Sequence, residues 1–192
     1  MAALQTIPTP VRPAHAALPA WLDRFERVHL DLGTGDGAYA LHVARTDSAC
    51  AVVGVDTCLD NLVKPARKGW DNLRFLAADA TDLPPWLWGH ADTVTINFPY
   101  GKLLRAVAGR EPWALLASTG AALAIRVNES AAMAEGIPFD EVLAGVRRAL
   151  EGRRARLTIV PGAELRAFPS TWAKRIAHGR PTRMLVASAD RR

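Results

Sequence analysis

The chain of 192 residues has the length of one domain, 22% of its residues are charged, 49% are hydrophobic, and its formal net charge is +5. These values are typical of a soluble globular protein and exclude wholesale disorder. The longest stretch without a charged residue, 112–125, is shorter than the roughly 20 apolar residues of a membrane helix, and the N-terminus lacks a signal-peptide pattern, so we expect a cytoplasmic protein.

Apolar runs alternate with segments of helix length along most of the chain. The pattern predicts strands over residues 28–32, 51–55, 73–77, 93–98, 121–127, 157–160 and 184–187. It predicts helices over residues 21–27, 38–45, 59–68 and 139–150, and two further helical segments between 103 and 117. Parallel strands need crossover connections, whereas the short final spacing favours an antiparallel pair. We therefore predict an α/β fold with a seven-stranded, mostly parallel sheet, helices on both faces and an antiparallel last strand.

The same pattern predicts the domain organisation. Residues 1–20 contain four prolines and no apolar periodicity, so we expect an extended or mobile lead-in. Residues 21–192 are expected to form a single domain, because the length of the chain is near the usual size of one domain. Residues 161–178 are too few to fold alone, and we expect them to lie over the sheet as a substrate-binding linker.

A glycine-rich loop follows the first predicted strand and opens the next helix. It reads Asp31-Leu-Gly-Thr-Gly-Asp-Gly37, which lacks both the dinucleotide-binding spacing GxGxxG and the GK[ST] of nucleoside triphosphate sites. Its two carboxylates would repel a pyrophosphate, whereas a carboxylate suits a cationic group such as an amine or a sulfonium. Asp56 ends the second predicted strand, the usual place of a carboxylate that accepts hydrogen bonds from ribose hydroxyls. The pattern therefore predicts a nucleoside ligand with a cationic end.

This combination resembles the class I S-adenosylmethionine-dependent methyltransferases, which have a Rossmann-like fold. The resemblance implies that S-adenosylmethionine is the cofactor. It also implies that the residues after the third predicted strand, Asp79, Ala80 and Thr81, hold the adenine of the cofactor. An aspartate at a strand end is equally compatible with a turn-forming role for Asp79.

The fourth predicted strand ends in a motif that indicates the substrate. In an open parallel sheet the carboxyl ends of the strands border the ligand crevice. The motif NFPYGKLL at 97–104 joins DLGTGDG at 31–37, GVD at 54–56, STWAKR at 170–175 and RMLV at 183–186. With these motifs the chain resembles, over most of residues 28–190, the 16S rRNA (adenine-1408) N1 methyltransferases that confer aminoglycoside resistance.

The resemblance implies which residues form the site. In that family two aromatic rings sandwich a flipped adenine, and by position these rings are Tyr100, where tryptophan is usual, and Trp172, while Phe98 and Pro99 shape the pocket. Stacking offsets the cost of extruding the base, and its N1 lone pair needs no general base. The implied cofactor-binding residues are Asp31, Gly33, Thr34, Gly35, Asp36, Gly37, Asp56, Thr57, Asp79, Ala80, Thr81, Asn97, Lys102 and Ser170.

The distribution of charge favours a polyanionic partner. Residues 1–126 carry 12 basic and 12 acidic side chains, whereas residues 127–192 carry 12 and 7, so the whole surplus lies in the last third. The resemblance identifies the partner as 16S rRNA in the 30S subunit. The candidate RNA-binding residues are Lys64, Arg67, Lys68, Lys174, Arg175, Arg180 and Arg183. The two cysteines and five histidines lack metal-ligand spacing, so we predict no metal, and we expect a monomer.

Three other functions stay open at this stage. One is a tRNA guanine-N7 methyltransferase, whose motif also begins with Asn-Phe-Pro. Another is a methyltransferase of small molecules, if the basic tail is only a solvated surface. The third is an inactive cofactor-binding or RNA-binding homologue, which is suggested by Tyr100 and by Thr81, where a glutamate is expected. Salt-sensitive RNA binding separates the RNA enzymes from the second, and turnover separates the enzymes from the third.

Overall fold

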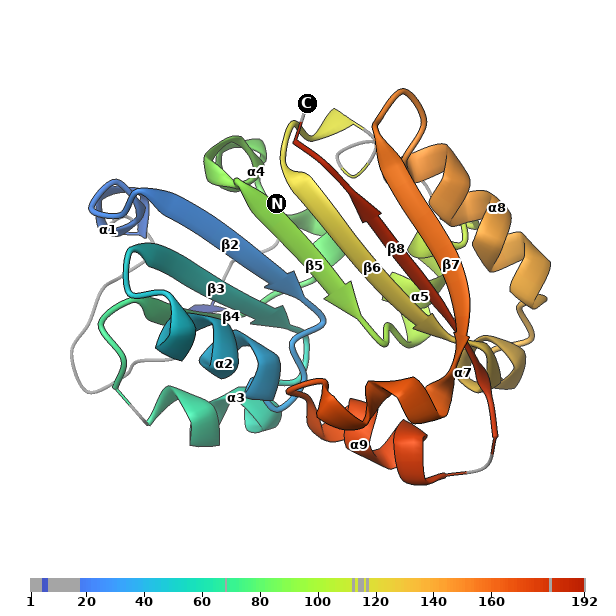
Figure 1. Ribbon diagram of the computed structural model, residues 1–192. Coiled ribbons are helices and arrows are strands. Elements are labelled where there is room, and N and C mark those ends of the chain that lie inside the picture. Colours follow the sequence, from blue (N-terminus) through green and yellow to red (C-terminus); the bar gives the residue numbers. More distant parts are fainter. Residues whose placement is uncertain are drawn as a thin grey trace. The chain divides into compact units, whose positions relative to one another are not determined.

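The computed structural model describes residues 5–6, 18–67, 69–111, 113, 116, 118–179 and 181–191. Contacts within the chain divide it into two compact units, Met1–Val94 and Thr95–Arg192, and each is considered by itself (Figure 1). Most of the expected lead-in 1–20 lies outside the described residues. The single domain over 21–192 and the substrate-binding role of 161–178 stay predictions.

Parallel strands form the centre of the first unit. β2 (Arg27–Leu32), β3 (Cys50–Asp56) and β4 (Leu73–Ala77) pair in parallel in the order β2-β3-β4, and the short β1 (Gln5–Thr6) pairs antiparallel with β4. All of β3 except its last residue is buried, as expected for a strand covered on both faces, where apolar side chains are favoured at every position. The three parallel strands confirm the prediction, whereas β1 was not predicted.

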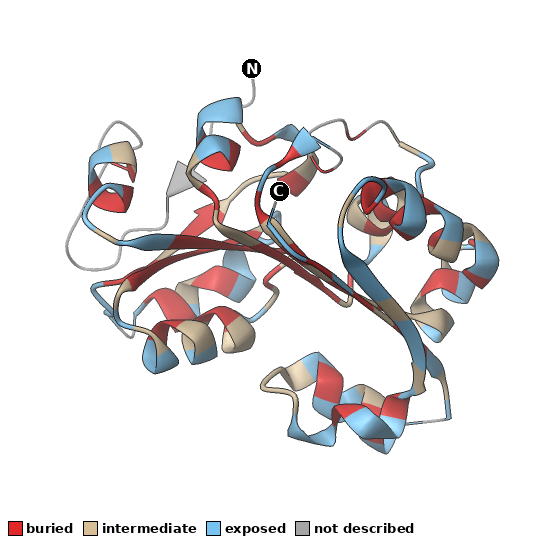
Figure 2. Cartoon of the chain, turned by 45° about the horizontal axis from the view of Figure 1, so that its top comes forward, coloured by how far each residue is buried: buried red, intermediate tan, exposed pale blue. Residues whose placement is uncertain are grey.

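Helices cover both faces of this unit (Figures 1 and 2). α2 (Ala38–Thr46) and α3 (Leu59–Ala66) lie on one face, and α1 (Leu18–Leu22) and α4 (Pro85–His90) lie on the other. Small residues of α2, Ala40 and Ala44, pack with Phe75 in one buried cluster. The helix predicted over 21–27 is wrong in its bounds, because the chain turns after α1 and β2 begins at Arg27.

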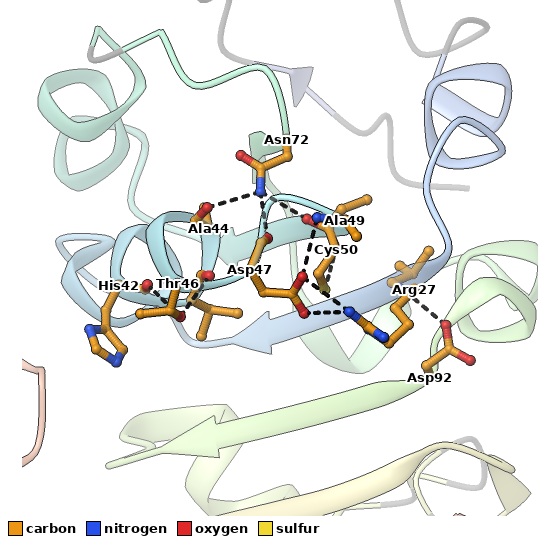
Figure 3. A network of polar contacts seen from close by, with 12 residues as sticks. Arg27, His42, Ala44, Thr46, Asp47, Ala49, Cys50, Asn72 and Asp92 are labelled. Atoms are coloured by element: carbon orange, nitrogen blue, oxygen red, sulfur yellow. Dashed lines mark hydrogen bonds and ion pairs between the residues drawn. The ribbon is translucent and has the colours of Figure 1, made fainter.

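A polar network holds the amino ends of the strands in place (Figure 3). The buried side chain of Asn72 lies before β4, and its amide nitrogen is 3.0 Å from the carbonyl oxygens of Ala44, Asp47 and Cys50. Arg27, at the start of β2, donates two hydrogen bonds to the carboxylate of Asp47, at 2.9 and 3.1 Å. The contacts of Asn72 satisfy backbone carbonyls at the end of the unit opposite the glycine loop.

Antiparallel strands dominate the second unit. β5 (Thr93–Asn97) crosses the unit boundary, and β6 (Ala122–Asn128), β8 (Arg183–Ala189) and β7 (Ala155–Pro161) follow, with β8 antiparallel to both β6 and β7. The antiparallel last strand confirms the prediction. Residues of β7 are mostly exposed, and β7 is drawn largely in pale blue in Figure 2.

Among the described residues, five helical elements flank these strands. They are α5 (Gly101–Val107), α7 (Glu129–Ala134), α8 (Phe139–Ala149), the 3-10 helix η3 (Gly162–Ala167) and α9 (Thr171–His178). Both η3 and α9 lie on the face opposite α8 (Figures 1 and 2). Leu165, Ala173 and Met184 form a small buried cluster under η3 and α9. The second helical segment predicted within 103–117 falls partly outside the described residues.

The buried histidine of β2 makes stability depend on pH. Burial lowers the pKa of the His29 imidazole to about 4, whereas the ordinary value is near 6.5. Between these two pH values the unfolded chain binds the proton and the folded chain does not, so the free energy of unfolding decreases as the pH falls from 6.5 to 4. The loss attributable to His29 is at most about 3 kcal/mol.

We expect His29→Leu to flatten this part of the pH profile, because leucine does not titrate. Urea unfolding at several pH values between 4 and 7 measures the effect. The exposed His178 of α9 is the control, and His178→Leu should leave the slope unchanged. A slope in His29→Leu equal to that of the unmodified protein would contradict the assignment.

Among the described residues, no helix is long and apolar enough to cross a membrane. These described residues also contain no group of three or more His, Cys, Asp or Glu side chains that could hold a metal ion. Of the two cysteines, Cys50 is buried and Cys58 is exposed, and neither forms a disulfide. Burial raises the pKa of the Cys50 thiol to about 11.

Candidate active site

The glycine loop has the backbone geometry that the sequence predicts. Gly33, Gly35 and Gly37 have φ values of 71°, 56° and 70°, a region in which a side chain would be strained. The N–H groups of Gly33 and Thr34 donate to the carbonyl oxygen of Val55, at 2.8 and 2.9 Å. The loop is thereby tied to the carboxyl end of β3, and a Cβ placed on Gly35 would meet no atom within 4 Å.

Two carboxylates organise the loop. Asp31, which is 1% exposed, accepts a hydrogen bond from Thr34 Oγ1 at 2.6 Å. Asp56 accepts the N–H of Gly35 on Oδ2 at 2.8 Å and the N–H of Cys58 on Oδ1 at 2.9 Å. Each carboxylate oxygen has a second lone-pair site, so Asp56 retains the capacity to accept two further hydrogen bonds. The loop and the second-strand acid are therefore in direct contact, as the spacing predicts.

The remaining acids near the loop have local partners. Asp36 is exposed and accepts the N–H of Ala38 at 3.2 Å, at the start of α2. Asp79 caps the 3-10 helix η2 (Ala80–Asp82) and accepts from the N–H and Oγ1 of Thr81, at 2.8 and 2.6 Å. The turn-forming alternative for Asp79 is thus observed, and its proposed contact with adenine stays a prediction. Thr57 is exposed, whereas Ala80 is buried.

Gly37 packs too closely against the core to accept a side chain. A Cβ at this position would lie 2.7 Å from Cζ of Phe75, and that ring is only 2% exposed, so it has no room to move. We expect Gly37→Ala to destabilise the protein by roughly 2–4 kcal/mol, the sum of backbone strain and overpacking.

Gly69 provides a matched control for this substitution. Its φ is +65°, but nothing lies within 4 Å of a Cβ placed there, so Gly69→Ala should cost only the backbone strain of about 1–2 kcal/mol. Urea denaturation of both variants measures the difference. Equal losses in the two variants would show that the contact with Phe75 does not matter.

The residues at the end of β5 and just after it contact β6 and the aromatic ring of Phe168. Phe98 has a φ of 56°, the one positive value at a non-glycine residue among those described, and its N–H donates to the carbonyl of Arg126 at 2.8 Å. Arg126 Nη1 donates to Asn97 Oδ1 at 2.9 Å, and its guanidinium lies 4.5 Å from the ring centroid of Phe168. Phe98 meets Phe168 edge-on, with centroids 5.8 Å apart. Phe98 is thus packed under η3 and α9, while Pro99 beside it is buried.

The two rings expected to stack on a base are exposed. Tyr100 is 65% exposed at the start of α5, and Trp172 is 54% exposed in the first turn of α9. A hydrogen bond to Glu135 raises the pKa of the Tyr100 hydroxyl, and Glu135 also pairs with Arg105 at 3.2 Å. The guanidinium of Arg175 lies 5.2 Å from the ring centroid of Trp172. Such exposure is unusual for large aromatic rings and is typical of binding surfaces.

The other expected contact residues fall into several environments. Lys102 is exposed on α5, and Ser170 is half-buried just before α9. Among the candidate RNA-binding residues, Lys64 and Arg67 of the first unit and Lys174, Arg175 and Arg183 of the second are exposed. Lys68 and Arg180 lie outside the described residues. A single phosphate-facing surface made by these residues stays a prediction.

Arg183 is paired within the protein, and its contact with phosphate stays a prediction. Its Nε donates to Oε1 and Oε2 of Glu129 at 3.0 and 2.9 Å, and its Nη2 also contacts Oε1. This pairing holds the pKa of Glu129 below its usual range, chiefly through the hydrogen bond from Arg183. Sequence reasoning missed Glu129, although it directly follows β6 and the carboxyl ends of strands are where site residues gather.

Two arginines of the last third of the chain contact backbone carbonyl oxygens. Arg153 donates from Nη1 to the carbonyl oxygen of Ala121 at 2.6 Å, and its Nη2 contacts the carbonyl oxygen of Thr119. Arg148 Nη2 donates to the carbonyl oxygen of Ala108 at 3.3 Å. These side chains satisfy backbone carbonyl groups at chain turns, so part of their donor capacity is used within the protein.

The fold and the glycine loop place the chain in the Rossmann-like methyltransferase class. The crystal structure of a point variant of the 16S rRNA (adenine(1408)-N(1))-methyltransferase from Catenulisporales acidiphilia, with cosubstrate SAM, matches it with a TM-score of 0.76 and 25% identity, covering 98% of this chain and 97% of that chain. The aminoglycoside resistance methyltransferase NpmB1 matches with a TM-score of 0.68 and 26% identity, over 97% of this chain and 100% of that chain. The predicted fold class is confirmed.

The chain belongs to the family described as "NpmA: 16S rRNA (adenine(1408)-N(1))-methyltransferase", whose profile matches residues 9–191. The 16S rRNA (adenine(1408)-N(1))-methyltransferase of Escherichia coli is 38% identical over 94 residues, which is 45% of this chain and 43% of that protein. The matched segment thus spans less than half the length of this curated relative. The resemblance stated from the motifs is confirmed at the level of the family.

Proposed function

We propose that the chain transfers a methyl group from S-adenosylmethionine to N1 of adenine-1408 in the 16S rRNA of the 30S subunit, which confers resistance to aminoglycosides. The observation that carries the proposal is the exposure of two aromatic side chains, Tyr100 and Trp172, in a chain that matches the family over residues 9–191. Exposed rings are what an extruded base needs, because stacking on them offsets the cost of leaving the helix.

The first unit has the features that the cofactor requires. Asp56 retains lone-pair sites for the ribose hydroxyls, while its contacts with Gly35 and Cys58 hold the loop in place. The absence of side chains at the glycines allows a ligand to approach the backbone. The buried carboxylate of Asp31 supplies negative charge at the loop for the cationic end of the cofactor. When bound, S-adenosylmethionine supplies a methyl group activated by its sulfonium.

The protein contributes positioning in this mechanism. Adenine N1 carries an in-plane lone pair, so no side chain has to remove a proton before transfer. Tyr100 and Trp172 hold the base, Phe98 and Pro99 shape the site beneath it, and alignment of the two reactants with exclusion of water accelerates the transfer. Lys64, Arg67, Lys174 and Arg175 contact phosphates of the rRNA, which makes binding sensitive to salt. The protein acts as a monomer on the ribosome, in the cytoplasm.

Incubation with labelled S-adenosylmethionine tests the proposal. The substrates are 30S subunits, free 16S rRNA and tRNA, and reverse transcription maps any modified base. A stop at adenine-1408 in 30S subunits is the expected result. Labelled tRNA would favour the guanine-N7 activity. Cofactor binding without labelled RNA would contradict the proposal and favour a small-molecule substrate or an inactive homologue.

A further inference from the structure

The helical segment that carries Trp172 leaves the sheet and returns to it at one place. We call this segment, Gly162–Gly179, the arm; it contains η3 and α9. β7 ends at Pro161 opposite Arg183, the first residue of β8, and the N–H of Gly162 donates to the carbonyl of Thr182 at 2.8 Å. The direction of the arm is therefore decided by what holds these two ends.

Five polar residues meet at the base of the arm. Thr182 Oγ1 donates to Asn128 Oδ1 at 2.8 Å and accepts from Ser130 Oγ at 2.9 Å, while Asn128 Oδ1 also accepts the N–H of Ser130 at 2.9 Å. Beside them, the carboxylate of Glu129 accepts hydrogen bonds from the side chain of Arg183 and, at 3.3 Å, from its backbone N–H. We call these residues the latch: Asn128, Glu129, Ser130, Thr182 and Arg183.

The latch restricts direction in a way that the apolar contacts of the arm do not. Leu165, Ala173 and Met184 form the buried part of an apolar cluster, against which partly buried residues such as Phe98 and Phe168 pack, and apolar contact is largely non-directional. A guanidinium bound to both oxygens of a carboxylate has a fixed plane. Arg183 is held further by the ring of Phe139, whose centroid lies 5.2 Å away. The start of α7, which follows β6, and the start of β8 are thus held against each other.

The location of the latch also argues against a phosphate-binding role for Arg183. The Glu129 side chain is 17% exposed and that of Arg183 is 60% exposed, so the carboxylate is the inner partner and the guanidinium covers it. Transferring this guanidinium to a phosphate would leave a largely covered carboxylate without its cation, which is costly. Nε and Nη2 of Arg183 are therefore engaged within the protein.

We propose that the latch is a positioning device that fixes the direction of α9, and so the orientation of the Trp172 ring for the target base. This inference rests on the proposed function for its role in catalysis, although the fixing of the arm does not depend on RNA. It makes Glu129, Thr182 and Arg183 positioning residues, with no contact to the substrate.

A charge swap separates a latch from a phosphate contact. We expect Arg183→Glu and Glu129→Arg each to raise amide exchange in residues 171–179 by about tenfold, and to lower kcat/KM for 30S methylation by about tenfold, with the Kd for S-adenosylmethionine unchanged. The double variant should restore both quantities. If the double variant stays as impaired as Arg183→Glu, and Glu129→Gln methylates normally, Arg183 acts on the RNA and the latch is wrong.

Two further comparisons guard against misfolding and against failure of the proposed function. Thr182→Val removes the central hydroxyl and should raise exchange in the arm, whereas Thr182→Ser should not. The pair Arg110 and Glu141, also bidentate at 2.6 and 2.8 Å in the second unit, is the control, and Arg110→Glu should leave exchange in the arm unchanged. Exchange reports on the latch even if 30S subunits are not methylated. Unchanged exchange in all latch variants would overturn the inference.

Discussion

Asp56→Asn is expected to lower the affinity for S-adenosylmethionine by about 100-fold, because the two charge-assisted hydrogen bonds that we propose between its carboxylate and the ribose, each contributing about 1.5–3 kcal/mol, are weakened. The amide also disturbs the loop. Both carboxylate oxygens of Asp56 accept backbone N–H groups, from Gly35 at 2.8 Å and from Cys58 at 2.9 Å. An asparagine has one oxygen and one NH2 group, so one of these N–H groups would face another donor.

Isothermal titration calorimetry with S-adenosylmethionine measures this effect. Asp60→Asn is the matched control, since Asp60 is an exposed carboxylate four residues further along the chain, in the first turn of α3. It removes the same charge and should leave the Kd unchanged. If Asp56→Asn binds the cofactor as tightly as Asp60→Asn, the carboxylate does not contact the ribose, and the nucleoside site lies elsewhere.

Trp172→Ala is expected to reduce kcat/KM for 30S methylation by roughly 10- to 100-fold, because a base stacked on an aromatic ring gains about 1–3 kcal/mol. Cofactor binding should be unchanged, since Trp172 lies on α9 of the second unit and the glycine loop lies in the first. Protein stability should change little, because the ring is 54% exposed. Trp172→Phe should retain most of the activity, since phenylalanine keeps an aromatic face.

Methylation of 30S subunits at several concentrations of substrate gives the kinetic constants. Trp86→Ala provides the control: Trp86 is a partly exposed tryptophan of α4, at 37%, for which no role in the reaction is proposed. Normal turnover in Trp172→Ala would exclude the stacking role. Loss of cofactor binding in the same variant would instead show that the substitution lowers activity by disturbing the fold of the cofactor site.

The order of strands and helices follows closely from the apolar periodicity, except at the ends of elements. α1 ends at Leu22 rather than extending to residue 27, because the pattern of apolar residues continues through the turn into β2. The helix predicted over 59–68 ends at Ala66, one residue after Pro65. Such ends depend on which backbone groups find partners, and a hydrophobic pattern does not show this.

Asp56 lies 21 residues after Gly35 in the chain, and their contact was nevertheless predictable from the sequence. Parallel pairing of β2 with β3 through a crossover helix brings the end of one strand beside the end of the next, so the contact of Gly35 with Asp56 follows from local rules. Glu129 and Arg183 are 54 residues apart, and no pattern of spacing pairs them. The interpretation of Arg183 as a phosphate contact therefore used its charge alone.

The strand–loop–helix unit, the glycines with positive φ, the acid at the end of β3 and the family motifs could be predicted from the sequence, because each depends on neighbours in the chain or on one crossover. The partners of the charged side chains and the exposure of the aromatic rings could not, because they depend on tertiary packing. Arg126 turns to Asn97 and Phe168, and Arg183 turns to Glu129, while Tyr100 and Trp172 face solvent. Long-range packing selects these partners, since a cation has the same sequence signature whether it meets a carboxylate, a ring or a phosphate.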